Sequence, residues 1–149
     1  MHYHFVDQPS YDRLVAENQF LEYATVHGHS YGTLRKPVED MMEQGYNVLL
    51  DIDPQGALTV MKNADDYVSV FILPPSFEDL RIRLHTRNTD DPEEIERRLN
   101  NARGEVKNVH RYQYAIINDN LELALTQLTY IVNAEKQRTN RFKPTIYQN

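Results

Sequence analysis

Apolar and polar residues alternate near the start of this chain, whereas later apolar runs show no alternation. Residues 20–27 alternate, which predicts a half-buried strand, and Gly28 and Gly32 bracket a turn and a second short strand. Residues 2–6 predict a further short strand. Unalternating apolar runs are typical of a parallel sheet that is covered on both faces. Three such runs span residues 47–53, 68–73 and 114–119.

Helical patterns follow each of the unalternating runs. They predict helices over residues 55–62, 77–85 and 121–138, and a charged helix over 93–108 that begins at Asp91 and Pro92. Residues 1–45 are therefore expected to form a small insert of antiparallel strands and helices. Residues 46–138 are expected to form an α/β core with a parallel sheet, and residues 139–149 a tail.

Local signals mark where several helices begin and end. Asp7 is a favourable N-cap for a helix near the start of the chain. Ser76 with Asp79 forms a capping-box-like start for the helix over residues 77–85. Gly45 stands at the position that closes a helix over residues 36–44.

Composition narrows the classes of function. The 149 residues have a net charge of -6 and 40% hydrophobic residues, so a packed core is expected and a non-specific grip on nucleic acid is disfavoured. There is no cysteine, no apolar run near the ~20 residues that span a membrane, and no signal-peptide pattern at the start. A cytoplasmic protein without nucleic-acid or membrane partners is the expectation.

Acidic and amide side chains stand where two of the predicted strands end. Asp51 and Asp53 are two residues apart, so they would point the same way from a strand, and Asn118 and Asp119 end another strand. Ligands of α/β sheets bind beyond such strand ends. These side chains either cap the following helices or share a binding site, and the pattern leaves both alternatives open.

Other polar residues are less clear from pattern alone. Glu22 lies inside an alternating strand, and the pattern favours a solvent-facing side chain. The polar loop 85–91, flanked by arginines, has the composition of a mobile phosphate-covering lid. The region contains five arginines, Arg81, Arg83, Arg87, Arg97 and Arg98. Most of the five are expected on solvated faces or in ion pairs.

The six histidines do not predict a metal site. His2 and His4 share one face of a strand, and His27 and His29 flank a glycine turn, but neither pair has a third ligand at a recognisable spacing.

Six motifs in order resemble the guanylate kinase family. FLEYA (20–24) and HGHSYGT (27–33) resemble the family's FLEWA and HGNYYGT, and VLLDIDPQG (48–56) resembles LLDIDxQG. FILPPS (71–76), the lid pair Arg87 and Thr89, and INDNL (117–121) continue the match. The resemblance runs from Tyr3 to about Arg138. It implies a P-loop kinase fold and transfer of phosphate from ATP, with Mg, to GMP.

The resemblance also implies roles for individual residues. Glu22 would bind guanine and Thr33 would meet the edge of the base, while Asp51 would help to hold GMP and Asp53 would lie near the phosphate path. The remaining matches concern phosphate and ATP. They are Tyr3 and Tyr31 for the GMP phosphate, Arg87 and Arg98 as lid-side arginines that meet the transferring phosphates, and Asn118 beside the adenine nucleotide.

The sequence also departs from the family pattern. None of its five glycines forms a G-x-x-x-x-G-K-[ST] loop, so we expect a chain that begins after the P-loop, binds ATP poorly and is nearly inactive alone. The lid, expected over about residues 85–108, has Thr86 and Asn88 where glycines are usual. The family's central strand would stand between 48–53 and 68–73, and its absence predicts exposed apolar edges and self-association. A non-catalytic guanylate-kinase-like binding module and a degenerate copy are the alternatives.

Overall fold

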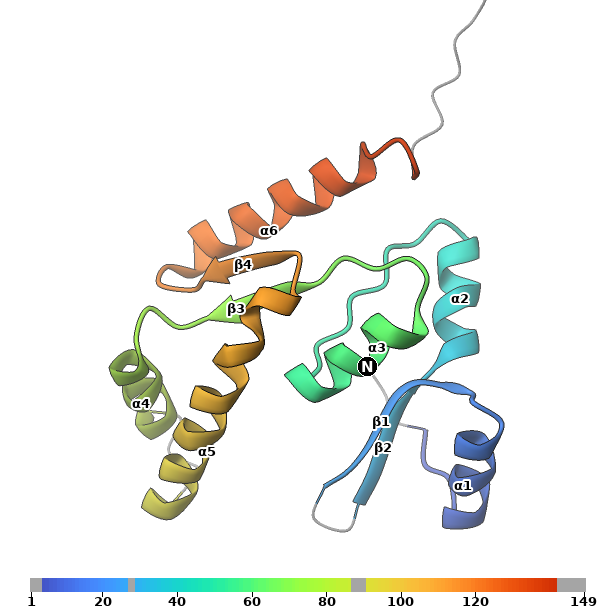
Figure 1. Cartoon of the computed structure of the whole chain (residues 1–149), viewed down its shortest axis with the longest axis horizontal. Helices are drawn as coiled ribbons and strands as arrows, with labels where there is room; N and C mark the ends of the chain where they lie inside the picture. The colour runs from blue at the N-terminus through green and yellow to red at the C-terminus, as the bar shows by residue number, and fades with distance from the viewer. Residues whose placement is uncertain (1–3, 27–28, 87–90, 142–149) are drawn as a thin grey trace, which may run out of the picture. The chain divides into compact units, whose positions relative to one another are not determined.

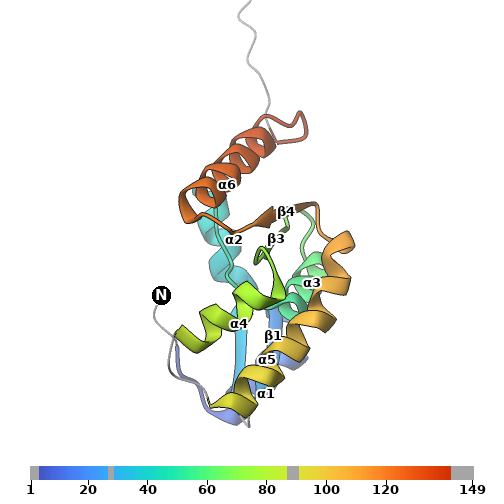
Figure 2. The ribbon, with the colours of Figure 1, turned by 90° about the vertical axis from the view of Figure 1, so that its left-hand side faces the viewer.

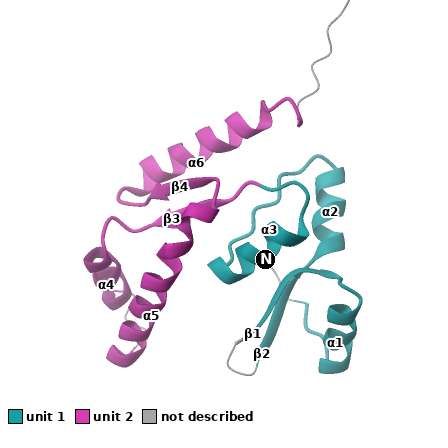
Figure 3. Ribbon diagram, in the orientation of Figure 1, with its two compact units in different colours: residues 1–67 teal, residues 68–149 magenta. Residues whose placement is uncertain are grey.

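The computed structural model describes residues 4–26, 29–86 and 91–141. The chain divides into two compact units, residues 1–67 and residues 68–149 (Figure 3). Tyr3, Arg87 and Asn88 lie outside the described residues, so the expectations for these positions stay predictions. The division of the chain into an insert, a core and a tail also stays a prediction.

The first unit is a hairpin of two strands with three helices (Figure 1). Its helix α1 begins after Asp7, whose Oδ1 accepts a hydrogen bond of 3.0 Å from the Ser10 N–H, as predicted. Gly45 follows α2 with φ +86°, which confirms the predicted helix end, since this conformation favours glycine. The elements of the unit are α1 (Gln8–Ala16), β1 (Phe20–Val26), β2 (His29–Leu34), α2 (Arg35–Glu43) and α3 (Pro54–Asn63).

An irregularity in β1 changes which side chains are buried. The antiparallel pairing matches Phe20 with Leu34 but Glu22 with Thr33, so Leu21 is an extra residue at a β-bulge. Three consecutive side chains, those of Phe20, Leu21 and Glu22, are consequently buried. The solvent-facing position that alternation predicted for Glu22 is therefore wrong, because the bulge interrupts the two-residue period.

The segment before α3 differs from the expectation. Residues 47–53, predicted as a strand, pair with no other strand within the described parts of the chain. Residues 4–6 likewise form no strand. A strand needs a neighbour to accept its backbone hydrogen bonds, and apolar residues alone do not supply one. The predicted strand at 47–53 is therefore wrong, and so is the part of the predicted strand 2–6 that the structure describes, residues 4–6.

The second unit contains the parallel pairing that the sequence predicted. Val70 pairs with Tyr114, and the register continues to Leu73 with Ile117. Helix α6 lies on one side of this pair, and α4 and α5 extend on the other (Figures 1 and 2). The unit comprises β3 (Val70–Leu73), α4 (Phe77–Thr86), α5 (Pro92–Glu105), the 3₁₀ helix η1 (Val106–Arg111), β4 (Tyr114–Ile117) and α6 (Leu121–Lys136).

The described residues thus form a mixed α/β structure with one antiparallel and one parallel pair of strands. Among the described residues β3 pairs only with β4, and Ile72 on β3 is 50% exposed. An open apolar edge of this kind fits the expectation of self-association, which stays a prediction.

Helices α4 and α5 form a pair with its own apolar core. The side chains of Leu84, Ile95 and Leu99 are buried together, and Leu80 packs against them. Both helices have side-chain caps, as predicted: the Asp79 N–H donates to Ser76 Oγ at 3.0 Å, and the Glu94 N–H donates to Asp91 Oδ1 at 2.8 Å. The pair covers most of the predicted lid, residues 85–108.

A buried carboxylate fixes α6 to β4. The Tyr114 hydroxyl donates a hydrogen bond of 2.6 Å to Glu135 Oε1, and the guanidinium groups of Arg138 and Arg141 lie beside the same carboxylate. The tyrosine hydrogen bond, helped by the arginine charges, lowers the pKa of Glu135. A lowered pKa contributes stability above the ordinary pKa of a glutamate, and this stability is lost as the pH falls through the lowered value.

The change Tyr114→Phe is expected to lower the unfolding temperature at pH 7, because Glu135 loses its main hydrogen-bond donor while it stays buried. The difference from the unchanged protein should narrow as the pH falls from the ordinary pKa of a glutamate through the lowered pKa of Glu135, since below that value the carboxylate is protonated in both proteins. Thermal unfolding followed by circular dichroism from pH 7 to pH 3 measures this. The matched control is Tyr130→Phe, because the Tyr130 side chain lies on α6, the helix of Glu135, and is 68% exposed. An equal loss in both variants would contradict the prediction.

Candidate functional site

The buried carboxylate of Glu22 is the chemical centre of the first unit. Its side chain is 9% exposed, and the Thr33 hydroxyl donates a hydrogen bond of 2.6 Å to its Oε1. The bulge in β1 produces this geometry, because it sets Glu22 directly opposite Thr33 across the hairpin. One hydroxyl satisfies only part of the acceptor capacity of a carboxylate, which can take about four hydrogen bonds.

The start of α3 lies against the same carboxylate. A Cβ atom placed on Gly56 would lie 3.2 Å from Glu22 Oε2 and 3.4 Å from Asp53 Oδ1. Asp53 caps α3, since its Oδ1 accepts a hydrogen bond of 2.7 Å from the Gly56 N–H. The sequence left open whether Asp51 and Asp53 cap the following helix or share a binding site, and Asp53 caps the helix. The carboxylates of Glu22 and Asp53 nevertheless lie close to one point in space.

Asp51 and Tyr31, the other described residues with a predicted role in the first unit, are exposed. Asp51 lies in the unpaired segment before α3 and its side chain is exposed. Tyr31 lies on β2, where its ring is 48% exposed and its carbonyl accepts a hydrogen bond of 3.1 Å from the Tyr11 hydroxyl. The structure thus brings Glu22, Thr33 and Asp53 together.

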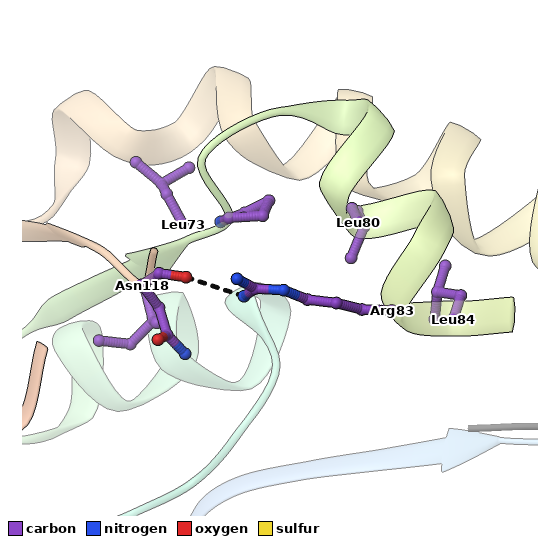
Figure 4. Close-up of a pocket in the computed structure, with 7 residues that line it drawn as sticks. Leu73, Leu80, Arg83, Leu84 and Asn118 are labelled. Atoms are coloured by element: carbon purple, nitrogen blue, oxygen red, sulfur yellow. Dashed lines mark hydrogen bonds between the residues drawn. The ribbon is translucent and has the colours of Figure 1, made fainter. Parts of the chain in front are cut away.

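In the second unit, Asn118 borders a small cavity beyond the carboxyl end of β4. The cavity has a volume of about 180 Å³ and apolar walls that include Leu73, Pro74 and Leu80 (Figure 4). The Asn118 N–H donates to the Leu73 carbonyl at 2.7 Å, so its backbone continues the strand pairing by one residue. Arg98, the other predicted residue of this unit, is exposed on α5.

Two residues of these sites carried no predicted role. Arg83 was expected on a solvated face or in an ion pair. Instead it donates to the backbone carbonyls of Asn118 at 2.8 Å and Asp119 at 3.5 Å, and so ties α4 to the end of β4 (Figure 4). The sequence predicted no role for Gly56 beyond its place in the motif VLLDIDPQG. The feature that could have singled it out is a glycine in the first turn of a helix, where alanine is the better helix former.

No group of three or more histidine, aspartate or glutamate side chains is arranged to hold a metal ion in the described part of the chain. None of the helices there is both long and apolar enough to cross a membrane.

Comparison with known proteins agrees with this architecture. The sequence profile of the family described as "Guanylate kinase" matches residues 1–135. A guanylate kinase of Thermus thermophilus is 45% identical over 139 residues, which make up 93% of this chain and 63% of that protein. The guanylate kinase of Syntrophotalea carbinolica is 47% identical over 141 residues, 95% of this chain and 67% of that protein.

A solved structure shares the fold. The crystal structure of guanylate kinase from Anaplasma phagocytophilum is similar with a TM-score of 0.73 and 36% identity, over 93% of this chain and 68% of that one. The chain belongs to the guanylate kinase family. It spans 62% and 63% of the length of the guanylate kinases from two strains of Thermus thermophilus that it matches.

Proposed function

We propose that residues 1–67 bind GMP and that Glu22 recognises its guanine base. The observation that supports this is the burial of a carboxylate whose only observed side-chain partner, among the described residues, is the Thr33 hydroxyl. Guanine presents two adjacent N–H donors, on N1 and on the 2-amino group, to which a carboxylate is the complementary acceptor. Adenine presents a ring acceptor at the N1 position, so the same carboxylate would repel it.

The remaining predicted residues extend this proposal to the phosphates. Thr33 would orient Glu22 and meet the base edge, and Asp51 would help to hold the nucleotide. The tyrosine hydroxyls of Tyr3 and Tyr31 would donate to the GMP phosphate, and Arg87 with Arg98 would meet the transferring phosphates from the lid. Phosphate oxygens accept hydrogen bonds, and tyrosine hydroxyl and guanidinium groups can donate them. The reaction of the whole protein would be phosphate transfer from ATP to GMP.

The fit to the donor nucleotide is partial. Asn118 borders a cavity with apolar walls, the kind of surface on which a purine ring packs. The phosphates and the magnesium ion of ATP have no comparable place, because the 149 residues contain no G-x-x-x-x-G-K-[ST] loop to surround them with backbone N–H groups. We therefore assign these 149 residues the GMP side of the reaction and the lid arginines, and not the backbone N–H groups that would hold the phosphates of ATP.

Glu22→Gln tests the proposal. The change replaces one acceptor oxygen by a donor NH₂ group, so GMP affinity is expected to fall about 10- to 100-fold while AMP affinity does not fall. Isothermal titration calorimetry with both nucleotides measures this. Glu43→Gln, at an exposed side chain of α2 in the same unit, is the control and should change neither affinity. Equal affinities for GMP and AMP in the unchanged protein, or no effect of Glu22→Gln on GMP, would refute the proposal.

A further inference from the structure

Gly56 occupies a position at which a side chain would crowd the carboxylate of Glu22. A Cβ there would lie 3.2 Å from Glu22 Oε2, closer than the ordinary contact distance, whereas Asp53 Oδ1 at 3.4 Å is within normal contact. The backbone of Gly56 does not itself demand glycine. Within the described residues only Gly45, among the glycines, has a positive φ, and Gly56 lies in the helix α3. Space, rather than backbone conformation, explains this glycine.

The end of α3 is tied to the strand that carries the carboxylate. The Asn63 side chain donates a hydrogen bond of 3.1 Å to the carbonyl of Leu21, the residue before Glu22. At the start of the helix the Asp53 cap is local, since its Oδ1 accepts from the Gly56 N–H at 2.7 Å within the first turn. The tie to β1 limits how far α3 can shift to make room for a larger residue at position 56.

The side chain of Glu22 is therefore confined from two directions. Thr33 on β2 binds Oε1 at 2.6 Å, and the bare Cα of Gly56 on α3 leaves the space next to Oε2. The orientation of a carboxylate decides whether its two oxygens can face two donors at once. A methyl group at position 56 would push Oε2 aside by a few tenths of an ångström and turn the carboxylate about its hydrogen bond to Thr33.

We propose that Gly56 is a positioning residue that sets the guanine specificity of the site, by leaving the space in which the Glu22 carboxylate faces both N–H groups of the base. This inference rests on the proposed GMP function of Glu22. Gly56 itself donates nothing to the base, and acts only through the carboxylate.

The affinity ratio of GMP to IMP reports the orientation of the carboxylate. The base of IMP keeps the N1–H group and lacks the 2-amino group, so the ratio measures the second hydrogen bond alone. Gly56→Ala is expected to lower this ratio about three- to tenfold, since a misaligned charged hydrogen bond loses much of its strength. Gly104→Ala is the matched control, because a Cβ at this helical glycine of α5 meets nothing within 4 Å. The control should leave the ratio unchanged.

A double variant separates positioning from a general effect on folding. In the Glu22→Ala background the carboxylate is gone, so adding Gly56→Ala should leave the GMP:IMP ratio unchanged and should not lower the unfolding temperature, because alanine is the better helix former. If Gly56→Ala alone does not fold, folding of the double variant still supports the inference. Failure of the double variant to fold would overturn it.

The outcomes also distinguish failure of the positioning role of Gly56 from failure of the proposed GMP function of Glu22. An unchanged GMP:IMP ratio in Gly56→Ala, together with loss of GMP preference in Glu22→Gln, would refute the positioning role and leave the proposed function standing. Unchanged GMP binding in Glu22→Gln would refute both.

Discussion

The 149-residue chain, supplied with GMP and Mg-ATP, is expected to release ADP about 10³- to 10⁶-fold more slowly than the guanylate kinase of Thermus thermophilus under the same conditions. Phosphate transfer depends on holding the reacting groups in line and on stabilising their charge. The sequence contains no P-loop, whose backbone N–H groups, lysine and hydroxyl would make these contacts. Loss of three charge-assisted contacts at ~1.5–3 kcal/mol each corresponds to that range of rates.

A coupled ADP-release assay measures the rate, and a fusion provides the control. A guanylate kinase P-loop segment joined ahead of the chain should raise turnover by most of the lost factor, because it would complete the GMP side and the lid that we propose for these residues. A rate of the 149 residues alone within tenfold of the Thermus enzyme would contradict the prediction. A fusion that folds and binds ATP without turnover would instead locate the defect in the lid, at Thr86 and Asn88.

Leu99→Ala is expected to cost about 2–5 kcal/mol in the free energy of unfolding of the second unit. The Leu99 side chain is 0% exposed and packs with Leu84 and Ile95 between α4 and α5. Truncation to alanine removes apolar contacts and leaves a cavity that the two capped helices can close only in part.

Urea unfolding followed by circular dichroism measures this loss, and hydrogen exchange assigns it to α4 and α5. Leu123→Ala is the control, because the Leu123 side chain on α6 is 64% exposed, and it should change the unfolding free energy by less than about 0.5 kcal/mol. Similar losses for both leucines would show that the α4–α5 core does not carry the stability of this unit.

Helices were the most predictable part of the fold, because their signals are local. Asp7, Asp91 and the Ser76–Asp79 pair cap helices where the sequence indicated, and each cap involves residues only three positions apart. The strand expected at residues 47–53 was wrong for the opposite reason. Pairing depends on a distant neighbour, and the apolar pattern of a segment does not report whether that neighbour is present.

The candidate site was predictable in its members but not in its geometry. The resemblance named Glu22 and Thr33 together, while the polar pattern placed Glu22 toward solvent. The extra residue Leu21 reconciles these, since it shifts the pairing by one and turns Glu22 inward. A bulge leaves no mark in an alternating sequence. The role of Gly56 depends on a contact across 34 positions of the chain, a kind of information that only a structure supplies.

The self-contained core of α4 and α5 gives the helix pair mechanical independence. Because Leu84, Ile95 and Leu99 pack within the pair, bending either helix would break this core, so any movement of the pair is expected to be that of one stiff body. Two short segments join the pair to the parallel strands, residues 74–75 before α4 and the 3₁₀ helix Val106–Arg111 after α5. A change of angle between the pair and the strands would have to be absorbed within these segments.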